Sequence, residues 1–210
     1  MRLGDLIAEL KVTPGRSFQP DLRVCDLTED SRTVVPGSLF VARPGTRTDG
    51  RRFIAQAAEA GAVAVLLERR AGDPSGVAEA LPGGTLPVAI VECEDAAGVC
   101  AAIAERFYGS PSSRLSLVGI TGTNGKSTTA HLVHRAMNAL DRRTGLIGTV
   151  EIDDGLGLSP AEMTTPPSSE ISRTLAVMVE QGCGAAAMEV SSHALDQKRV
   201  EALRFKVGVF

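Results

Sequence analysis

The chain has 210 residues, enough for one large domain or two small ones with packed apolar cores. It is 43% hydrophobic and 22% charged, as in ordinary globular proteins, and its net charge of -3 excludes a global basic field that would attract nucleic acid or anionic lipid. Six Phe, one Tyr and no Trp offer few stacking platforms for single-stranded nucleic acid, and no apolar run approaches the roughly 18 residues that span a bilayer. We therefore expect neither nucleic acid nor a membrane as a partner.

The N-terminal stretch MRLGDLIAELK has acids among its apolar positions, so it predicts a short amphipathic helix rather than a signal peptide. The four cysteines, Cys25, Cys93, Cys100 and Cys183, form no CxxC pair and no metal-ligand spacing. They predict reduced, partly buried thiols, which suits a cytoplasmic protein.

The first half of the chain alternates between short strand and helix patterns. VCDLTEDSR and GSLFVA predict strands separated by a Pro-Gly turn. In DGRRFIAQAAEAGA, a helical period places Phe53, Ile54, Ala57 and Ala58 on one side. AVAVLLE and PVAIVE predict buried strands around an irregular loop rich in Pro and Gly, and DAAGVCAAIAERFYG predicts a second helix.

Residues 110–113, SPSS, read as a compact linker, so we place one domain over 1–109 and a second over 110–210. LSLVGIT is a continuous apolar run, as expected for a strand covered on both faces of a parallel sheet. A helix over 126–140, a strand at TGLIGTV, a helix at PPSSEISRTLAVMVEQG and strands at AAAMEV and FKVGVF follow. This alternation predicts an α/β fold with a parallel sheet. Because the sequence ends at Phe210 within an apolar run, we expect it to be part of a longer protein.

The stretch VGITGTNGKSTTA, residues 118–130, joins a predicted strand to a predicted helix through a glycine-rich loop. Its end matches the P-loop, whereas Gly119 stands one place earlier than the usual first glycine. Glycines let backbone N–H groups converge on phosphate oxygens, and the following helix adds its N-terminal dipole. Lys126 supplies a charge for the β- and γ-phosphates, and Ser127 a hydroxyl for Mg²⁺. A plain turn and a dinucleotide fingerprint are the alternatives, but the context and Lys126 favour a nucleoside triphosphate. The predicted nucleotide-binding residues are Gly122, Thr123, Asn124, Gly125, Lys126, Ser127 and Thr128.

The form G-x-x-G-T-N-G-K-[ST] resembles the ATP loop of the Mur ligase superfamily, which also includes folylpolyglutamate synthetase. Three further stretches resemble the UDP-N-acetylmuramoyl-tripeptide synthetases, the MurE type: residues 29–66, MTTPPS, and MEVSSHALDQKRVEALRFKVGVF. The resemblance covers nearly all 210 residues. It implies a small α/β uridine-nucleotide-binding domain, followed by the first part of a parallel-sheet P-loop ATPase domain.

The same resemblance implies an ATP- and Mg²⁺-dependent amide ligase of peptidoglycan precursor synthesis. Such enzymes phosphorylate the D-Glu carboxylate of UDP-N-acetylmuramoyl-L-alanyl-D-glutamate, and the amine of a diamino acid then attacks the acyl phosphate. The choice between meso-diaminopimelate and L-lysine stays open. The family's carbamylated lysine, second-metal histidine and C-terminal domain have no counterpart before Phe210, so we expect that these 210 residues cannot complete the reaction alone.

Site residues follow from the resemblance one at a time. Glu189 resembles the family's Mg²⁺-binding carboxylate, and an anionic oxygen suits a hard cation. Lys126 and Glu189 are therefore the candidate catalytic residues, and Ser127 and Glu189 the candidate metal ligands. The resemblance assigns the UDP-muramoyl-dipeptide to Ser31, Thr164, Thr165, Ser191, Gln197 and Arg199. Arg199 can hold a carboxylate bidentately, and the two threonines have an alternative role as a cap for the helix near Pro167.

Weaker signals complete the pattern. The 46–49 turn, TRTD, resembles the loop that closes on the uracil or the diphosphate, although Asp49 and Gly50 could be only the turn before a helix. His193 follows two serines, but EVSSH lacks the Gly-x-Ser-x-Gly elbow of a hydrolase. For His131 and His134 we expect packing or solvent exposure rather than metal binding.

Three alternatives to the ligase remain. A folylpolyglutamate synthetase shares the glycine loop but not the separate first domain or SSHAL. A non-catalytic nucleotide-binding module is a description of these 210 residues by themselves. A P-loop phosphotransferase would form a stable phosphate ester on a hydroxyl instead of an acyl phosphate.

Overall fold

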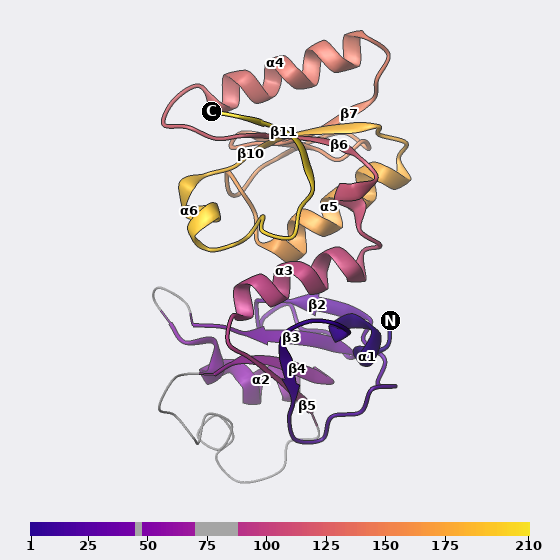
Figure 1. Ribbon diagram of the computed structural model, residues 1–210, viewed down its shortest axis with the longest axis vertical. Helices are drawn as coiled ribbons and strands as arrows, with labels where there is room; N and C mark the ends of the chain where they lie inside the picture. The colour runs from indigo at the N-terminus through magenta and orange to yellow at the C-terminus, as the bar shows by residue number, and fades with distance from the viewer. Residues whose placement is uncertain (45–47, 70–87) are drawn as a thin grey trace. The chain divides into compact units, whose positions relative to one another are not determined.

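A computed structural model of the chain describes residues 1–44, 48–69 and 88–210. The chain forms two compact units, Met1–Ile103 (unit 1) and Ala104–Phe210 (unit 2), each with its own β-sheet (Figure 1). The boundary that the sequence predicts between residues 109 and 110 stays a prediction. The predicted Pro- and Gly-rich loop falls mainly on 70–87, outside the described residues.

Unit 1 contains a five-stranded sheet with the order β1-β5-β4-β3-β2. Its four parallel strands are β2 (Asp26–Thr28), β3 (Ser38–Ala42), β4 (Ala64–Glu68) and β5 (Ala89–Cys93). These four strands were predicted. β1 (Val12–Pro14), which pairs antiparallel with β5, was not. The N-terminal amphipathic helix is α1 (Leu3–Ile7), and three of its apolar side chains are buried.

The helix predicted around residues 49–62 begins as a 3-10 turn, η1 (Gly50–Phe53), and continues as α2 (Ile54–Glu59). Ile54 and Ala57 pack in the core against strands β3 to β5, as the period predicts. Phe53, in contrast, is 37% exposed, so its predicted place on the apolar side is wrong. The reason is that a 3-10 turn has about three residues per turn instead of about 3.6, which rotates Phe53 away from the buried stripe.

Unit 2 contains a six-stranded sheet with the order β11-β6-β10-β7-β8-β9. The four predicted strands run parallel: β11 (Phe205–Val209), β6 (Ser116–Ile120), β10 (Ala185–Glu189) and β7 (Thr144–Ile147). An unpredicted antiparallel hairpin, β8 (Glu151–Asp153) and β9 (Leu158–Pro160), extends the sheet beyond β7. The SPSS stretch forms a 3-10 helix, η2 (Pro111–Ser113), in which Pro111 and Ser112 are buried.

Helices cover both faces of this sheet, as the continuous apolar strands predict (Figure 1). α4 (Lys126–Ala139) lies on one face, and α5 (Ser168–Glu180) lies on the other with the short α6 (Ser192–Asp196). Successive strand residues alternate between the two cores. The α5 side contains Leu117, Ile147 and Met188, and the α4 side contains Val118, Leu146 and Ala187. α3 (Ala96–Phe107) is the chain segment that runs from unit 1 into unit 2.

The cysteines agree with the expectation of thiols. Cys93, Cys100 and Cys183 are buried, Cys25 is exposed, and no disulfide joins any of the four, all of which lie in described segments. Burial raises the pKa of Cys93 to about 12 and also raises the pKa of Cys183, so both side chains stay protonated at neutral pH.

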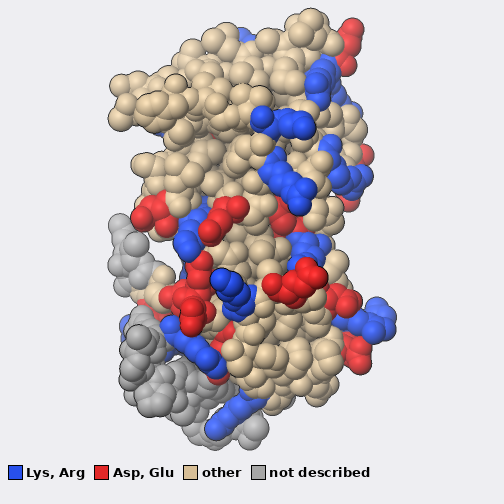
Figure 2. All heavy atoms as spheres, in the orientation of Figure 1, with Lys and Arg blue, Asp and Glu red and all other residues tan. Residues whose placement is uncertain are grey.

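Charged side chains of both signs are interspersed on the face shown in Figure 2, in line with the small net charge. Within the part of the chain that the structure describes, none of the helices combines the length and apolar character needed to cross a bilayer.

Candidate active site

The glycine loop, residues 121–125, connects the C-terminal end of β6 to the first residue of α4. Gly122 and Gly125 have φ angles of +131° and +79°, which residues with a Cβ rarely adopt. Nζ of Lys126 donates to the carbonyl oxygen of Gly122 at 2.8 Å, so the ammonium group lies over the loop. Because the first N–H groups of a helix have no acceptor within it, the loop and α4 together present amide donors and a cation, as a phosphate requires.

The other predicted nucleotide-binding residues lie in the same loop and in the first turn of α4. Lys126 and Ser127 are half-buried at the start of α4, and the exposed members are Thr123, Asn124, Gly125 and Thr128. Gly119 does not belong to this loop, because it lies inside β6. A Cβ on Gly119 would come within 2.7 Å of the Phe205 ring, so this glycine is needed for packing rather than for phosphate.

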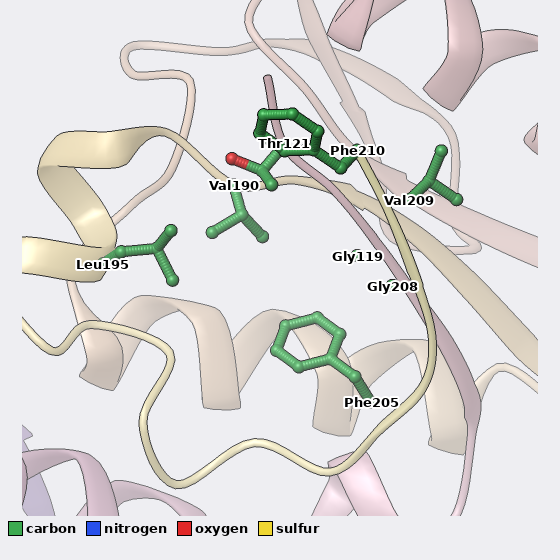
Figure 3. A pocket seen from close by; sticks show the side chains of 8 residues that line it. All are labelled: Gly119, Thr121, Val190, Leu195, Phe205, Gly208, Val209 and Phe210. Carbon is green, nitrogen blue, oxygen red and sulfur yellow. The ribbon is translucent and has the colours of Figure 1, made fainter.

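An apolar pocket of about 310 Å³ lies beside β6 and β11 (Figure 3). The side chains of Val190, Leu195 and Phe205 point toward its interior, and Phe210 stands at its rim. Its lining supplies almost no hydrogen-bond donors and no charge. The pocket also includes Thr121, the first residue of the glycine loop, but its apolar lining does not suit a phosphate.

Glu189 ends β10, the strand next to β6, and its side chain is fully buried at 0% exposure. Its Oε2 accepts hydrogen bonds from Oγ of Ser127 and Oγ1 of Thr149, both at 3.0 Å, and its Oε1 accepts one from the backbone N–H of Thr149 at 2.8 Å. Both carboxylate oxygens thus have donors, as a buried carboxylate requires. Thr149 was not predicted. The available signal was its place directly after a parallel strand, at the sheet edge where ligands gather.

The oxygen atoms at this point fit a magnesium ion. Hydroxyl and carboxylate oxygens are the ligands that Mg²⁺ prefers, and two adjacent ligands of an octahedral ion at ~2.1 Å are about 3.0 Å apart. Oγ of Ser127 and Oε2 of Glu189 are 3.0 Å apart. In the described segments no group of three or more His, Cys, Asp and Glu side chains forms a metal site. The spacing and chemistry of Ser127 and Glu189 therefore fit two oxygen ligands of one such ion.

Thr165 connects the metal-side carboxylate to the predicted substrate residues. Its hydroxyl, on a residue only 1% exposed, donates to the carbonyl oxygen of Glu189 and accepts from the N–H of Ser191, both at 3.0 Å. The alternative reading of the threonines as a cap of α5 is wrong, because the N-cap residue is Pro167, which makes no side-chain cap hydrogen bond. The reason is that Thr165 is turned toward the end of β10.

Arg199 completes this cluster. Its Nη1 donates to the carbonyl oxygen of Thr165 at 2.6 Å, and its Nε and Nη2 donate to Oε1 of Gln197 at 3.1 and 2.8 Å. Ser191 caps α6, because its Oγ accepts from the N–H of Ala194 at 3.1 Å. The structure therefore brings Thr164, Thr165, Ser191, Gln197 and Arg199 to the same end of the sheet as Glu189.

Ser31 is the one predicted site residue in unit 1. It is 9% exposed, and its Oγ donates to Oε1 of Gln56 at 3.1 Å. Residues 46 and 47 of the predicted uridine loop lie outside the described residues. Asp49 caps η1, since its carboxylate accepts from the N–H of Arg51 at 3.1 Å.

The histidines have structural partners. Nε2 of His131 lies 3.1 Å from Glu151, and Nε2 of His134 lies 3.0 Å from Asp153, so both rings fasten α4 to β8. His193 is exposed and contacts Gln197 at 2.9 Å, whereas the Ser191 hydroxyl caps α6. The serine and the imidazole thus face different partners, which gives no support to a hydrolase.

Comparison with known proteins agrees with this geometry. The description "Mur ligase family, catalytic domain" matches residues 26–108, and "Mur ligase middle domain" matches residues 120–210. The chain therefore belongs to the Mur ligase family. Both the resemblance seen in the sequence and the α/β fold with an N-terminal domain and a nucleotide-binding domain are confirmed.

Within the family, the chain is similar to UDP-N-acetylmuramoyl-L-alanyl-D-glutamate–2,6-diaminopimelate ligases. It is 41% identical to the protein of this name from Gloeobacter violaceus over 210 residues, which are 100% of this chain and 40% of that protein. The one from Streptomyces avermitilis is 45% identical over 205 residues, 97% of this chain and 39% of that protein. The chain thus spans about 40% of the length of these relatives.

Solved structures show the same fold. A ligase with the same name superposes with a TM-score of 0.77 at 22% identity, covering 99% of this chain and 40% of that one. MurF from Acinetobacter baumannii gives a TM-score of 0.54 at 18% identity, covering 87% and 34%.

Proposed function

We propose that the full-length protein is an ATP-dependent amide ligase that joins 2,6-diaminopimelate to UDP-N-acetylmuramoyl-L-alanyl-D-glutamate. The observation that carries this proposal is the meeting of three groups at one sheet edge. These are the glycine loop with Lys126, the Ser127–Glu189 oxygen pair, and the Thr165–Arg199 cluster. The names of the relatives supply the identity of the acceptor and of the amino acid. They favour diaminopimelate over L-lysine, which the sequence alone left open.

The reaction has two steps. A carboxylate oxygen of the D-Glu unit attacks the γ-phosphorus of ATP, and ADP leaves, which gives an acyl phosphate. The amine of the amino acid then attacks the acyl carbon, phosphate leaves, and the nitrogen loses a proton. The first step requires two anions to approach each other, so its barrier depends on positive charge and oriented N–H donors at the phosphates.

The residues of this chain supply those groups. The amides of the glycine loop and of the first turn of α4 bind the β- and γ-phosphates, and Lys126 adds a charge that follows the γ-phosphate during transfer. Ser127 and Glu189 would hold Mg²⁺, which neutralises charge on the phosphate oxygens when it is bound. Arg199, whose planar fork already contacts Gln197 and Thr165, is suited to orient an acceptor carboxylate.

The test is the substitution Lys126→Ala in the full-length protein. We expect turnover, measured as amide product and released phosphate, to fall ~100- to 1000-fold, because one stabilising group of the transferring phosphate is lost. Lys206→Ala, on the exposed face of β11, is the matched control and should keep normal turnover. Near-normal turnover of Lys126→Ala, or a product that is a stable phosphate ester, would contradict the proposal.

A further inference from the structure

Thr149, in the turn after β7, makes more contacts with the Glu189 carboxylate than any residue singled out in the sequence. We propose that Thr149 is a positioning residue that holds Glu189 in the orientation required for the metal ion and links it to Thr164 of the substrate loop. This inference rests on the proposed function, since it concerns the same nucleotide and metal site.

One residue contacts both oxygens of the carboxylate. The backbone N–H of Thr149 donates to Oε1 at 2.8 Å, and its hydroxyl donates to Oε2 at 3.0 Å. Because Glu189 is fully buried, these bonds replace the water that an exposed carboxylate would have. Two donors from one residue restrict rotation about the last side-chain torsion of Glu189, which is otherwise broad.

The chain is shaped to allow this contact. Gly148 precedes Thr149, and a Cβ on Gly148 would lie 2.9 Å from Oε1 of Glu189. A side chain there would force either the Glu189 carboxylate or the turn to shift. The glycine is therefore what lets the Thr149 N–H approach Oε1.

The two carboxylate oxygens of Glu189 therefore have different partners and different roles. Oε1 is held by a main-chain donor, which cannot turn away. Oε2 faces two hydroxyls, those of Ser127 and Thr149. Hydroxyl groups can rotate to accept or donate, so Oε2 is the oxygen that can bind an ion together with Ser127. Partners of this kind orient metal ligands and commonly raise metal affinity 10- to 100-fold.

The hydroxyl of Thr149 also connects the Glu189 carboxylate to Thr164 of the predicted substrate-binding loop. Oγ1 of Thr149 lies 3.0 Å from Oε2 of Glu189 and 3.1 Å from Oγ1 of Thr164. The hydroxyl of Thr149 is oriented to donate to both acceptors, and because it carries one proton it donates to Oε2 of Glu189 or to Oγ1 of Thr164 at any one time. A short chain of hydroxyls thus joins the predicted acceptor loop to the predicted metal ligand.

The experiment measures ADP binding to the full-length protein by calorimetry, once with Mg²⁺ and once with EDTA. Thr149→Val removes the hydroxyl and keeps the shape and the backbone N–H. Thr149→Ser restores the hydroxyl. Thr144→Val is the matched control, because Thr144 is a buried threonine at the start of β7 whose Oγ1 donates only to the carbonyl oxygen of Arg142 at 2.6 Å.

We expect Mg²⁺ to tighten ADP binding in the unaltered protein, and Thr149→Val to reduce that gain ~10- to 100-fold without changing binding in EDTA. Thr149→Ser and Thr144→Val should keep the gain. An unchanged gain in Thr149→Val overturns the positioning role and leaves the proposed function standing. If the unaltered protein itself shows no gain from Mg²⁺, the metal assignment fails and this inference fails with it. Should Thr149→Val not fold, as judged by circular dichroism, Thr149→Ala is measured in its place with the same expected loss.

Discussion

Among single residues, Arg199 allows the effect of a positive charge to be tested apart from the effect of side-chain shape. Its guanidinium donates from three nitrogens in one plane, to the Thr165 carbonyl and to the Gln197 amide oxygen. Lysine carries the same charge but has no planar fork, so it cannot maintain both contacts while also binding a carboxylate.

The substitution Arg199→Lys in the full-length protein therefore tests the acceptor site. We expect KM for the UDP-muramoyl-dipeptide to rise ~10- to 100-fold, the equivalent of about 1.4–2.8 kcal/mol for lost charged hydrogen bonds, while KM for ATP changes little. Steady-state kinetics with each substrate varied in turn measures both values. Arg173→Lys, on the exposed side of α5, is the control. An equal rise in both KM values would point to general damage rather than to an acceptor contact.

How far single residues can be predicted depends on their distance along the chain. Lys126 and Ser127 belong to one continuous motif, so their side chains reach the same ligand wherever the rest of the fold lies. The hydrogen bonds from Thr149 to Glu189 could not be predicted in this way. Thr149 lies 40 residues from Glu189 in the chain, and the two meet only through the pairing of β7 with β10. No local pattern contains that pairing.

Among elements, the junction of α3, η2 and α5 contains a buried acid that the sequence did not single out. Glu105 is 7% exposed and accepts hydrogen bonds from Ser112 at 2.6 Å and Ser172 at 3.2 Å. Burial raises the pKa of this carboxyl, an effect that the two serines and the charge of Arg204 oppose only in part. Three helical segments, α3, η2 and α5, thus meet at one titratable group.

This arrangement predicts a pH-dependent effect of Glu105→Gln. A carboxyl with a raised pKa in the folded chain stabilises the fold while it is protonated, below an unfolded pKa of about 4.3, and loses that contribution as pH rises through the folded pKa. Glutamine does not ionise, so its melting temperature relative to the unaltered chain should increase by a few degrees from pH 4 to pH 7. Thermal unfolding across this pH range checks it, with the exposed Glu180→Gln as control. A difference that stays constant with pH would show that the burial of Glu105 does not govern its titration.

The predicted elements were those with long, regular patterns. Continuous apolar runs identified β6 and β10, and the period of Ile171, Leu175 and Met178 identified α5, because each has a core on the expected side. The hairpin β8–β9 escaped prediction, since its residues are partly or fully exposed and show no apolar alternation. Its place in the sheet depends on hydrogen bonds to β7 and on the carboxylates that meet His131 and His134.

For the whole molecule, the sequence predicted two α/β parts and a phosphate loop but not the order of the strands. That order places β10 between β6 and β7, so the ends of three strands bring together the loop before Lys126, Glu189 and Thr149. A parallel sheet collects ligand-binding groups at its carboxyl edge whatever the order. Which groups become neighbours is decided by long-range pairing, which a single sequence does not contain.

Acceptor choice is the property of the whole protein that best separates the ligase from its rivals. The glycine loop would serve a folylpolyglutamate synthetase equally well, so ATP binding cannot distinguish the two. Residues 26–108 match the description "Mur ligase family, catalytic domain". Ser31 with the predicted uridine loop is the part of the prediction that requires a UDP-linked acceptor.

We therefore expect the full-length protein, supplied with ATP, Mg²⁺ and 2,6-diaminopimelate, to form an amide with UDP-N-acetylmuramoyl-L-alanyl-D-glutamate. Tetrahydrofolate with glutamate in place of that acceptor and amino acid should give no product. Mass spectrometry of the products, with L-lysine as a competing amine, measures acceptor and amino acid choice in one experiment. Product from the folate arm would move the protein to the rival class, and a preference for L-lysine would correct the amino acid but leave the chemistry of the phosphate loop intact. Because both arms use the same nucleotide site, a failure of ATP binding would abolish both, whereas a wrong acceptor would abolish only one.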